Sequence, residues 1–114
     1  MINITIEKVV NTIGMQVEDW DQNCCDICIK LLQSKLVIGT LKDGYYIGQI
    51  SAKSSFSVID KDKPLRHCWI ETMDGDIIDP TYWTISGEDP YVFFGNNNGT
   101  YVNGETLPYS FYGQ

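Results

Sequence analysis

The chain has few basic residues and no long apolar run. Eight Lys and Arg stand against 15 Asp and Glu in 114 residues, for a formal net charge of −7. Binding to a nucleic-acid backbone requires clustered basic side chains, so this balance argues against nucleic acid as a partner. No apolar run approaches the length of a membrane-spanning helix, so no membrane contact is expected either. The scattered Lys and Arg residues do not exclude a small anionic ligand.

The sequence also lacks internal repeats and low-complexity segments. Apolar residues make up 43% and charged residues 20% of the chain, which is ordinary for a globular protein. This length can bury one core but has little to spare for a second. We therefore expect a single domain over residues 1–114.

Cysteine is limited to four residues, Cys24, Cys25, Cys28 and Cys68. The first residues lack the basic start and apolar stretch of a signal peptide. These features predict a cytoplasmic protein with reduced thiols.

Cys25 and Cys28 have the C-x-x-C spacing, which raises two alternatives. A zinc site needs two further ligands, and the second half of a paired motif is absent. A thioredoxin-like pair follows a strand, whereas the run before Cys25 is polar. A metal site formed by Cys24, Cys28, His67 and Cys68 is a third option, but strand alternation puts His67 and Cys68 on opposite faces. The sequence thus predicts no metal and no cofactor.

Helical periodicity is confined to the first third of the chain. Apolar residues recur with helical spacing from Ile6 to Ile13, where Asn3 or Thr5 would cap the helix and Gly14 would end it.

A second helix should begin near Asp21 or Asn23 and run to about Ser34. In this helix Cys24 and Cys28 share the core-facing side with two leucines.

Strand-like periodicity follows the helices. The candidate strands are residues 36–42, 45–51, 65–72, 76–79 and 91–94. Asp43-Gly44 and Asp74-Gly75 are hairpin turn signals between the first and second pairs, and residues 96–99 form a loop or turn. Helices before strands predict an α+β fold, with N-terminal helices packed on an antiparallel sheet.

The second hairpin carries the only histidine, His67, and the carboxylate Asp79. A two-residue turn at Asp74-Gly75 would put Asp79 on the face opposite His67. A three-residue loop would instead make the two residues diagonal neighbours, with Cβ atoms roughly 7 Å apart. Gly75 suits the left-handed residue that ends such a loop. A simpler reading makes His67 a half-buried strand residue and Asp79 the start of a turn with Pro80.

A thiol, an imidazole and a carboxylate are the minimum parts of a cysteine nucleophile. Cys24 and Cys25 both lie at a helix start, where the helix dipole favours a thiolate. Cys24 is the preferred nucleophile, because it should face the sheet while Cys25 points sideways beside Asp26. Cys28 reads as a packed core residue. The alternative is that all these thiols only fill space. Gln22 or the Cys24 backbone N–H would supply oxyanion donors.

These segments resemble the transglutaminase-like branch of the papain-like cysteine fold. The segments that carry the resemblance are His67-x-Trp69-x-Glu71, Asp74-Gly75 and Asp79-Pro80-Thr81, together with Trp20 ahead of Asn23-Cys24. The resemblance covers roughly residues 20–95, apart from 40–62. Small proteins of bacteria and their phages with the same signature are similar. The His-to-Asp spacing is tighter than in most larger members, and the chain is near the minimum size for the fold.

The resemblance implies acyl transfer by a Cys24–His67–Asp79 triad on a papain-like or transglutaminase-like core. Cys24 would attack an amide, ester or thioester of a protein, a peptide or a small molecule. The acyl group would pass to water, in hydrolysis or deamidation, or to an amine, in transamidation. Trp69 and Trp83 would line the site.

The alternative function is a non-catalytic binding module. The same pocket would then sequester a ligand or block a host protein, as small acidic phage proteins do. Tyr101, Tyr109, Phe111 and Tyr112 would form an exposed aromatic patch for such a partner. Thiol reactivity separates the two functions, because only an enzyme needs one highly reactive cysteine.

Overall fold

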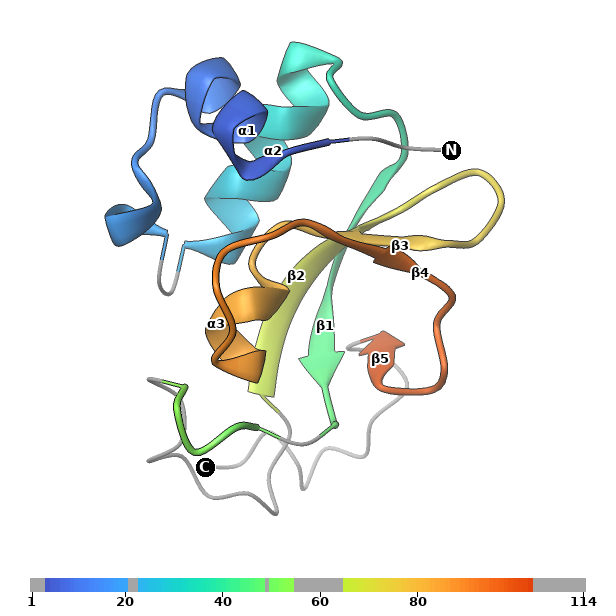
Figure 1. Cartoon of the computed structure of the whole chain (residues 1–114). Helices are drawn as coiled ribbons and strands as arrows, with labels where there is room; N and C mark the ends of the chain where they lie inside the picture. Colours follow the sequence, from blue (N-terminus) through green and yellow to red (C-terminus); the bar gives the residue numbers. More distant parts are fainter. Residues whose placement is uncertain (1–3, 21–22, 49, 55–64, 104–114) are drawn as a thin grey trace.

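A computed structural model of the chain describes residues 4–20, 23–48, 50–54 and 65–103. The fold is α+β, with a five-stranded antiparallel sheet in the order β4-β3-β2-β1-β5 (Figure 1). The helices are α1 (Ile6–Ile13), the 3-10 turn η1 (Val17–Asp19), α2 (Cys24–Ser34) and α3 (Tyr82–Ser86). The strands are β1 (Thr40–Tyr46), β2 (Leu65–Glu71), β3 (Ile77–Asp79), β4 (Phe93–Gly95) and β5 (Tyr101–Asn103).

Helix α1 confirms the predicted first helix and its ends. The Thr5 side chain accepts a hydrogen bond from the Lys8 N–H, and Gly14 ends the helix in the left-handed region at φ 71°. A side-chain cap of this kind is worth about 1 kcal/mol, and glycine adopts the left-handed conformation without a Cβ clash.

Helix α2 begins at Cys24 after Asn23 and ends at Ser34, as the sequence predicts. Its buried residues are Ile27, Cys28 and Leu31. Through these residues, the apolar face of α2 packs on the sheet. Burial of each large aliphatic side chain contributes about 1.5–3 kcal/mol.

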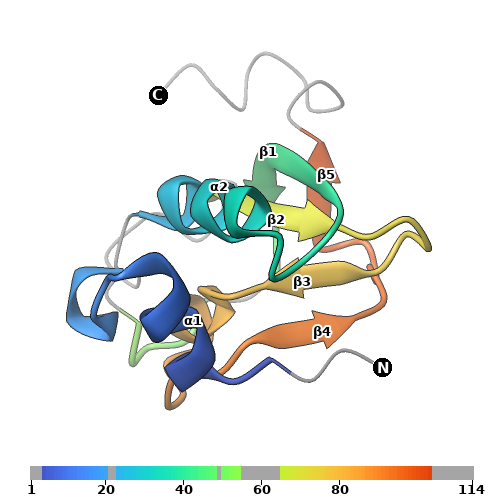
Figure 2. The same cartoon turned by 90° about the horizontal axis from the view of Figure 1, so that it is seen from above.

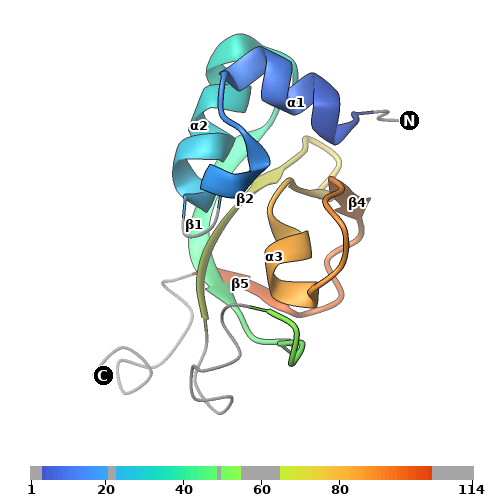
Figure 3. The ribbon, with the colours of Figure 1, turned by 60° about the vertical axis from the view of Figure 1, so that its left-hand side comes forward.

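The helices lie on both faces of the sheet (Figure 3). Helix α2 packs on β1 and β2, and α1 packs against α2. The core on this face includes Val9, Trp20, Ile27, Cys28, Leu31, Val37, Ile70 and Ile78. Helix α3 covers the other face, where the core includes Tyr46, Leu65, Trp69, Ile77, Ile85 and Tyr101.

The β2–β3 hairpin has the predicted three-residue loop. Ile70 pairs with Ile78, and the Thr72 N–H donates to the Asp76 carbonyl at 2.9 Å. Gly75 ends the loop in the left-handed region, at φ 86°. This register excludes the alternative two-residue turn, which would pair Ile70 with Asp79.

The predicted hairpin at Asp43-Gly44 is wrong. Both residues lie inside β1, which runs unbroken and pairs with β2 on one side and β5 on the other. Gly44 lies opposite both His67 and Asn103, and its φ is not positive. Pairing with two distant strands therefore overrides the local turn signal.

The loop at residues 96–99 is not a hairpin turn, because β4 and β5 lie at opposite edges of the sheet. Figure 2 shows the strands side by side from β1 through β2 and β3 to β4. The expected aromatic patch is also incorrect at Tyr101, which is 6% exposed in β5. Tyr109, Phe111 and Tyr112 lie outside the described residues.

Candidate active site

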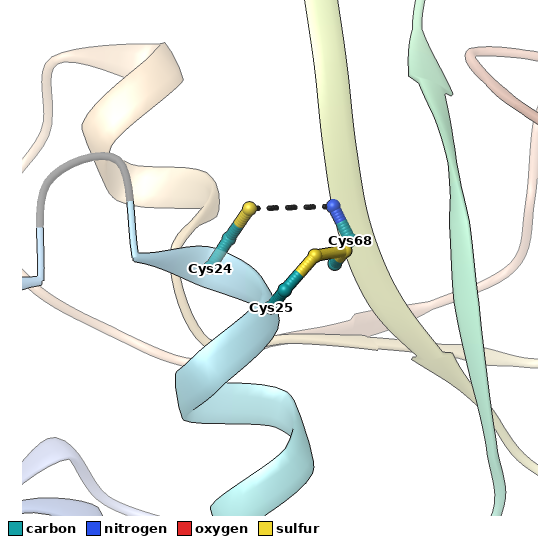
Figure 4. A group of neighbouring side chains, drawn as sticks. All are labelled: Cys24, Cys25 and Cys68. Atoms are coloured by element: carbon teal, nitrogen blue, oxygen red, sulfur yellow. Dashed lines mark hydrogen bonds between the residues drawn. A yellow bond between two sulfur atoms is a disulfide. The ribbon is translucent and has the colours of Figure 1, made fainter.

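The end of β3 creates the space for Cys24. β3 pairs with β2 only at Ile70 and Glu71, and Pro80, which cannot donate to a ladder, follows its last residue. The N–H of Cys68 on β2 therefore has no β3 partner and donates to the Cys24 sulfur at 3.4 Å (Figure 4). The start of α2 thus lies beside β2 just where β3 leaves it.

His67 and Asp79 form a buried pair. The His67 Nε2 and the Asp79 Oδ2 are 2.7 Å apart, and their side chains are 4% and 0% exposed. These are the residues that the hairpin register was predicted to bring together, and their side chains are in contact.

Two further residues hold the Asp79 carboxylate. The Tyr101 hydroxyl donates to Oδ2 at 2.8 Å. The Thr81 N–H and hydroxyl both reach Oδ1, at 3.1 and 3.3 Å. With His67, the carboxylate accepts four hydrogen bonds, so a buried charge that would otherwise be costly is well satisfied.

The protonated form of His67 is strongly favoured. Burial lowers the pKa of His67, but the charge and hydrogen bond of Asp79, followed by Cys24, raise it to about 10. The ring is therefore an imidazolium at neutral pH. The hydrogen bond of the ring to Asp79 is made by Nε2.

Cys28 lies one turn deeper in α2 and is fully buried. Burial, followed by the charges of Asp79 and Cys24, raises the pKa of the Cys28 thiol well above its ordinary value. Cys28 is consequently an unreactive thiol, in keeping with the packed role expected for it.

Cys25 and Cys68 are joined by a disulfide, with Cα atoms 5.1 Å apart (Figure 4). This differs from the expected set of reduced thiols and from the sideways direction expected for Cys25. The packing of α2 on β2 brings the two residues within bonding range across 43 positions of sequence. Cys24 and Cys28 are the free thiols.

The tryptophans have mainly packing roles. Trp20 is fully buried, and its indole N–H donates to the Met15 carbonyl at 3.0 Å. Its ring centroid lies 6.2 Å from that of Trp83. Trp69 stacks beside His67 at 6.3 Å and does line the histidine. Gln22, a predicted oxyanion donor, lies outside the described residues.

Sequence reasoning missed Tyr101 and Thr81 as partners of Asp79. The contact with Thr81 could have been predicted, because an Asp side chain often accepts a hydrogen bond from the backbone N–H two residues later. Tyr101 had none, since it comes from a three-residue strand 22 positions away.

The sulfurs of Cys24, Cys25 and Cys68 form a cluster and all lie within 4.8 Å of one another. It differs from the set considered from the sequence, because it contains Cys25 in place of Cys28 and His67.

No family model, curated protein or solved structure matches the chain. Among the helices of the described ranges, none has the length and apolar character required to cross a membrane.

Proposed function

We propose that the chain is a cysteine acyl-transfer enzyme with a transglutaminase-like or papain-like core. Cys24 is the nucleophile, His67 carries the proton and Asp79 orients His67. One observation carries the proposal: the free thiol of Cys24 lies 3.4 Å from the N–H of Cys68, the residue next to His67, and the His67 ring lies 2.7 Å from Asp79. The acyl donor is an amide, ester or thioester of a protein, a peptide or a small molecule.

Acylation begins from a thiolate–imidazolium pair, in which the proton of Cys24 is already on His67. The thiolate attacks the substrate carbonyl carbon and forms a C–S bond. His67 then returns the proton to the leaving amine, alcohol or thiol as its bond to the carbonyl carbon breaks. The product of this half-reaction is a thioester on Cys24.

Deacylation repeats these proton transfers with a second nucleophile. Water or an amine attacks the thioester and gives a proton to His67. The Cys24 sulfur leaves as a thiolate, and the thiolate–imidazolium pair is restored. Water yields a carboxylic acid, and an amine yields a new amide.

Asp79 keeps the imidazole in one orientation through this cycle. Its four hydrogen bonds fix the carboxylate, which in turn fixes the orientation of the His67 ring. An orienting carboxylate of this kind also stabilises the imidazolium without taking its proton.

The arrangement of elements supports the same proposal. Cys24 lies at the start of a helix that packs on an antiparallel sheet. His67 and Asp79 follow it in the chain, on the paired strands β2 and β3. This order is similar to that of the family that the His and Asp segments resemble.

The first test is site-resolved labelling by iodoacetamide at pH 7, without reductant, in the native chain and in His67→Ala. A free cysteine is only a few per cent thiolate at this pH. Cys24 should therefore label fast in the native chain and about tenfold more slowly without the imidazolium, as read by mass spectrometry.

Cys28 serves as the internal control, because it is the other free thiol and is fully buried. Its labelling should stay slow in both proteins. Equal, slow labelling of Cys24 with and without His67 would show that the thiol and the imidazole do not act together, and the binding-module function would then be favoured.

A second test looks for the covalent intermediate. A small activated thioester should leave its acyl group on Cys24 of the native chain and leave none in Cys24→Ser. In His67→Ala the rate of acylation should fall by about 100-fold or more, the contribution typical of a positioned base. Acylation spread over several lysines, with Cys24 unmodified, would contradict the proposal.

A further inference from the structure

Three sulfur atoms from two elements converge beside β2. Cys24 and Cys25 open α2, Cys68 lies on β2, and all three sulfurs are within 4.8 Å of one another (Figure 4). The proposed acyl transfer uses only Cys24. The other two are joined as a disulfide, so the cluster has a second chemical state, in which that bond is open.

Opening the bond creates a set of three soft ligands. A dithiol reductant gives two electrons and two protons to the disulfide, which becomes the thiols of Cys25 and Cys68, and the reductant is oxidised to its own disulfide. Sulfurs around a tetrahedral Zn²⁺ lie about 3.8 Å apart, since the Zn–S distance is about 2.3 Å. That separation lies within the 4.8 Å that already encloses the three atoms.

The surroundings also suit thiolates. The Cys68 N–H already donates to the Cys24 sulfur at 3.4 Å, and such N–H bonds to ligand sulfurs hold metal sites in place. Cys24 and Cys25 lie in the first turn of α2, an eleven-residue helix whose dipole favours negative charge there. Cys68 is fully buried, whereas Cys24 and Cys25 are half-buried and give an ion access.

We infer that the reduced chain binds one thiophilic cation, of the Zn²⁺ class, through Cys24, Cys25 and Cys68. A water molecule completes the tetrahedron. The cation and the Cys25–Cys68 disulfide are mutually exclusive, because they use the same two sulfurs. Binding itself is independent of the proposed function. If Cys24 is the nucleophile, the ion also blocks it. A small-molecule disulfide, which takes up two electrons and is reduced to two thiols as Cys25 and Cys68 rejoin, releases the ion.

The test is a titration of the reduced, full-length chain with Co²⁺, which reports thiolate ligation by its absorption bands, followed by displacement with Zn²⁺. The reductant is removed without oxygen before the titration. We expect one equivalent to bind to the reduced chain and none to the oxidised chain.

Cys24→Ser and Cys28→Ser are the matched variants, both on α2. Loss of even an outer partner of a metal site costs about 10- to 100-fold in affinity, so Cys24→Ser should weaken binding by at least this much. Cys28→Ser should bind like the native chain. Equal binding by the oxidised chain, or unchanged affinity in Cys24→Ser, would overturn the inference. Loss of binding in Cys28→Ser would overturn it as well, by placing the ion on a different ligand set.

This readout needs no substrate. A chain that binds Co²⁺ as expected but fails to form an acyl-enzyme would keep the metal site and lose the proposed function. The reverse result would keep the function and lose the metal site.

Discussion

Asp79 is the residue on which the candidate site depends. It is fully buried, yet each carboxylate oxygen has partners: His67 and Tyr101 on Oδ2, and Thr81 on Oδ1. Because all of its hydrogen bonds are made, this buried carboxylate also fixes the positions of the side chains that donate to it.

Replacing this charge should change the titration of His67. In Asp79→Asn the pKa of His67 should fall well below about 10, because the main influence that raises it is gone while burial, which lowers it, remains. His67 is the only histidine, so its ring signals in an NMR pH titration report the change directly.

The same shift has a consequence for stability. The folded pKa of about 10 lies above the ordinary 6.5, so the stabilisation from the protonated ring is complete below about pH 6.5 and is lost as the pH rises through 10. In Asp79→Asn the free energy of unfolding should lack this part of its pH dependence. A His67 pKa that stays near 10 in the variant would show that Asp79 is not its cause.

Tyr101→Phe should destabilise the fold by about 1.5–3 kcal/mol, the usual worth of a hydrogen bond to a charged group. The hydroxyl it removes donates to Asp79 at 2.8 Å in a buried position. Urea unfolding measures the loss. Tyr91→Phe is the control, because Tyr91 is half-buried and its partner Glu88 is exposed. Equal losses in the two variants would contradict a special role for the Tyr101 hydroxyl.

Among the elements, the two Asp-Gly pairs show what local sequence can decide. Asp74-Gly75 forms the predicted loop, because no strand in the described ranges pairs with residues 73–75. Asp43-Gly44 carries the same signal, but β1 is the strand next to the β5 edge and pairs on both sides. A turn at Gly44 would break both ladders, and this information lies in residues far along the chain.

Gly75→Ala should cost about 1–2 kcal/mol, the penalty for a Cβ in the left-handed region. The site has open space, with no atom within 4 Å of the added Cβ, so the cost is conformational. Gly75→Asn should cost less, because asparagine tolerates this conformation. Thermal unfolding of both variants checks the order. If alanine is no worse than asparagine, the loop does not need its left-handed residue in solution.

The first two helices were easier to predict than the elements late in the chain. Helix α1 has sequence signals at both of its ends, Thr5 and Gly14. β4 overlaps the strand predicted at 91–94, whereas α3 and β5 were not predicted. Tyr101 lies on β5, so the histidine–aspartate half of the candidate site could be predicted while its support from β5 could not.

At the scale of the whole molecule, the Cys25–Cys68 disulfide ties the helical layer to the sheet. It closes a loop of 43 residues, for which the chain-entropy relation gives a stabilisation of about 4 kcal/mol at 25 °C. The oxidised chain should therefore be more stable to urea than the reduced chain by about this amount, measured with a chelator present.

Cys68→Ala is the matched control, because it removes the β2 sulfur to which Cys25, or Cys24 in its place, would bond. Its free energy of unfolding should be the same with and without reductant. A difference of under about 1 kcal/mol between the oxidised and reduced native chain would mean that the layers are held by packing alone.

Because Cys24 and Cys25 are neighbours in sequence, a disulfide from either of them to Cys68 gives the same mass and the same number of free thiols. A thiolate at Cys24 that attacks Cys68 forms a Cys24–Cys68 bond and frees Cys25, with no oxidant consumed and no change in mass. A purified sample of uniform mass and thiol content is therefore compatible with two covalent structures, one of which has lost the proposed nucleophile. In a mass-spectrometric peptide map, fragmentation of the peptide bond between residues 24 and 25 distinguishes them. If Cys24 is the nucleophile, the fraction of active molecules is therefore set by disulfide isomerism as well as by folding.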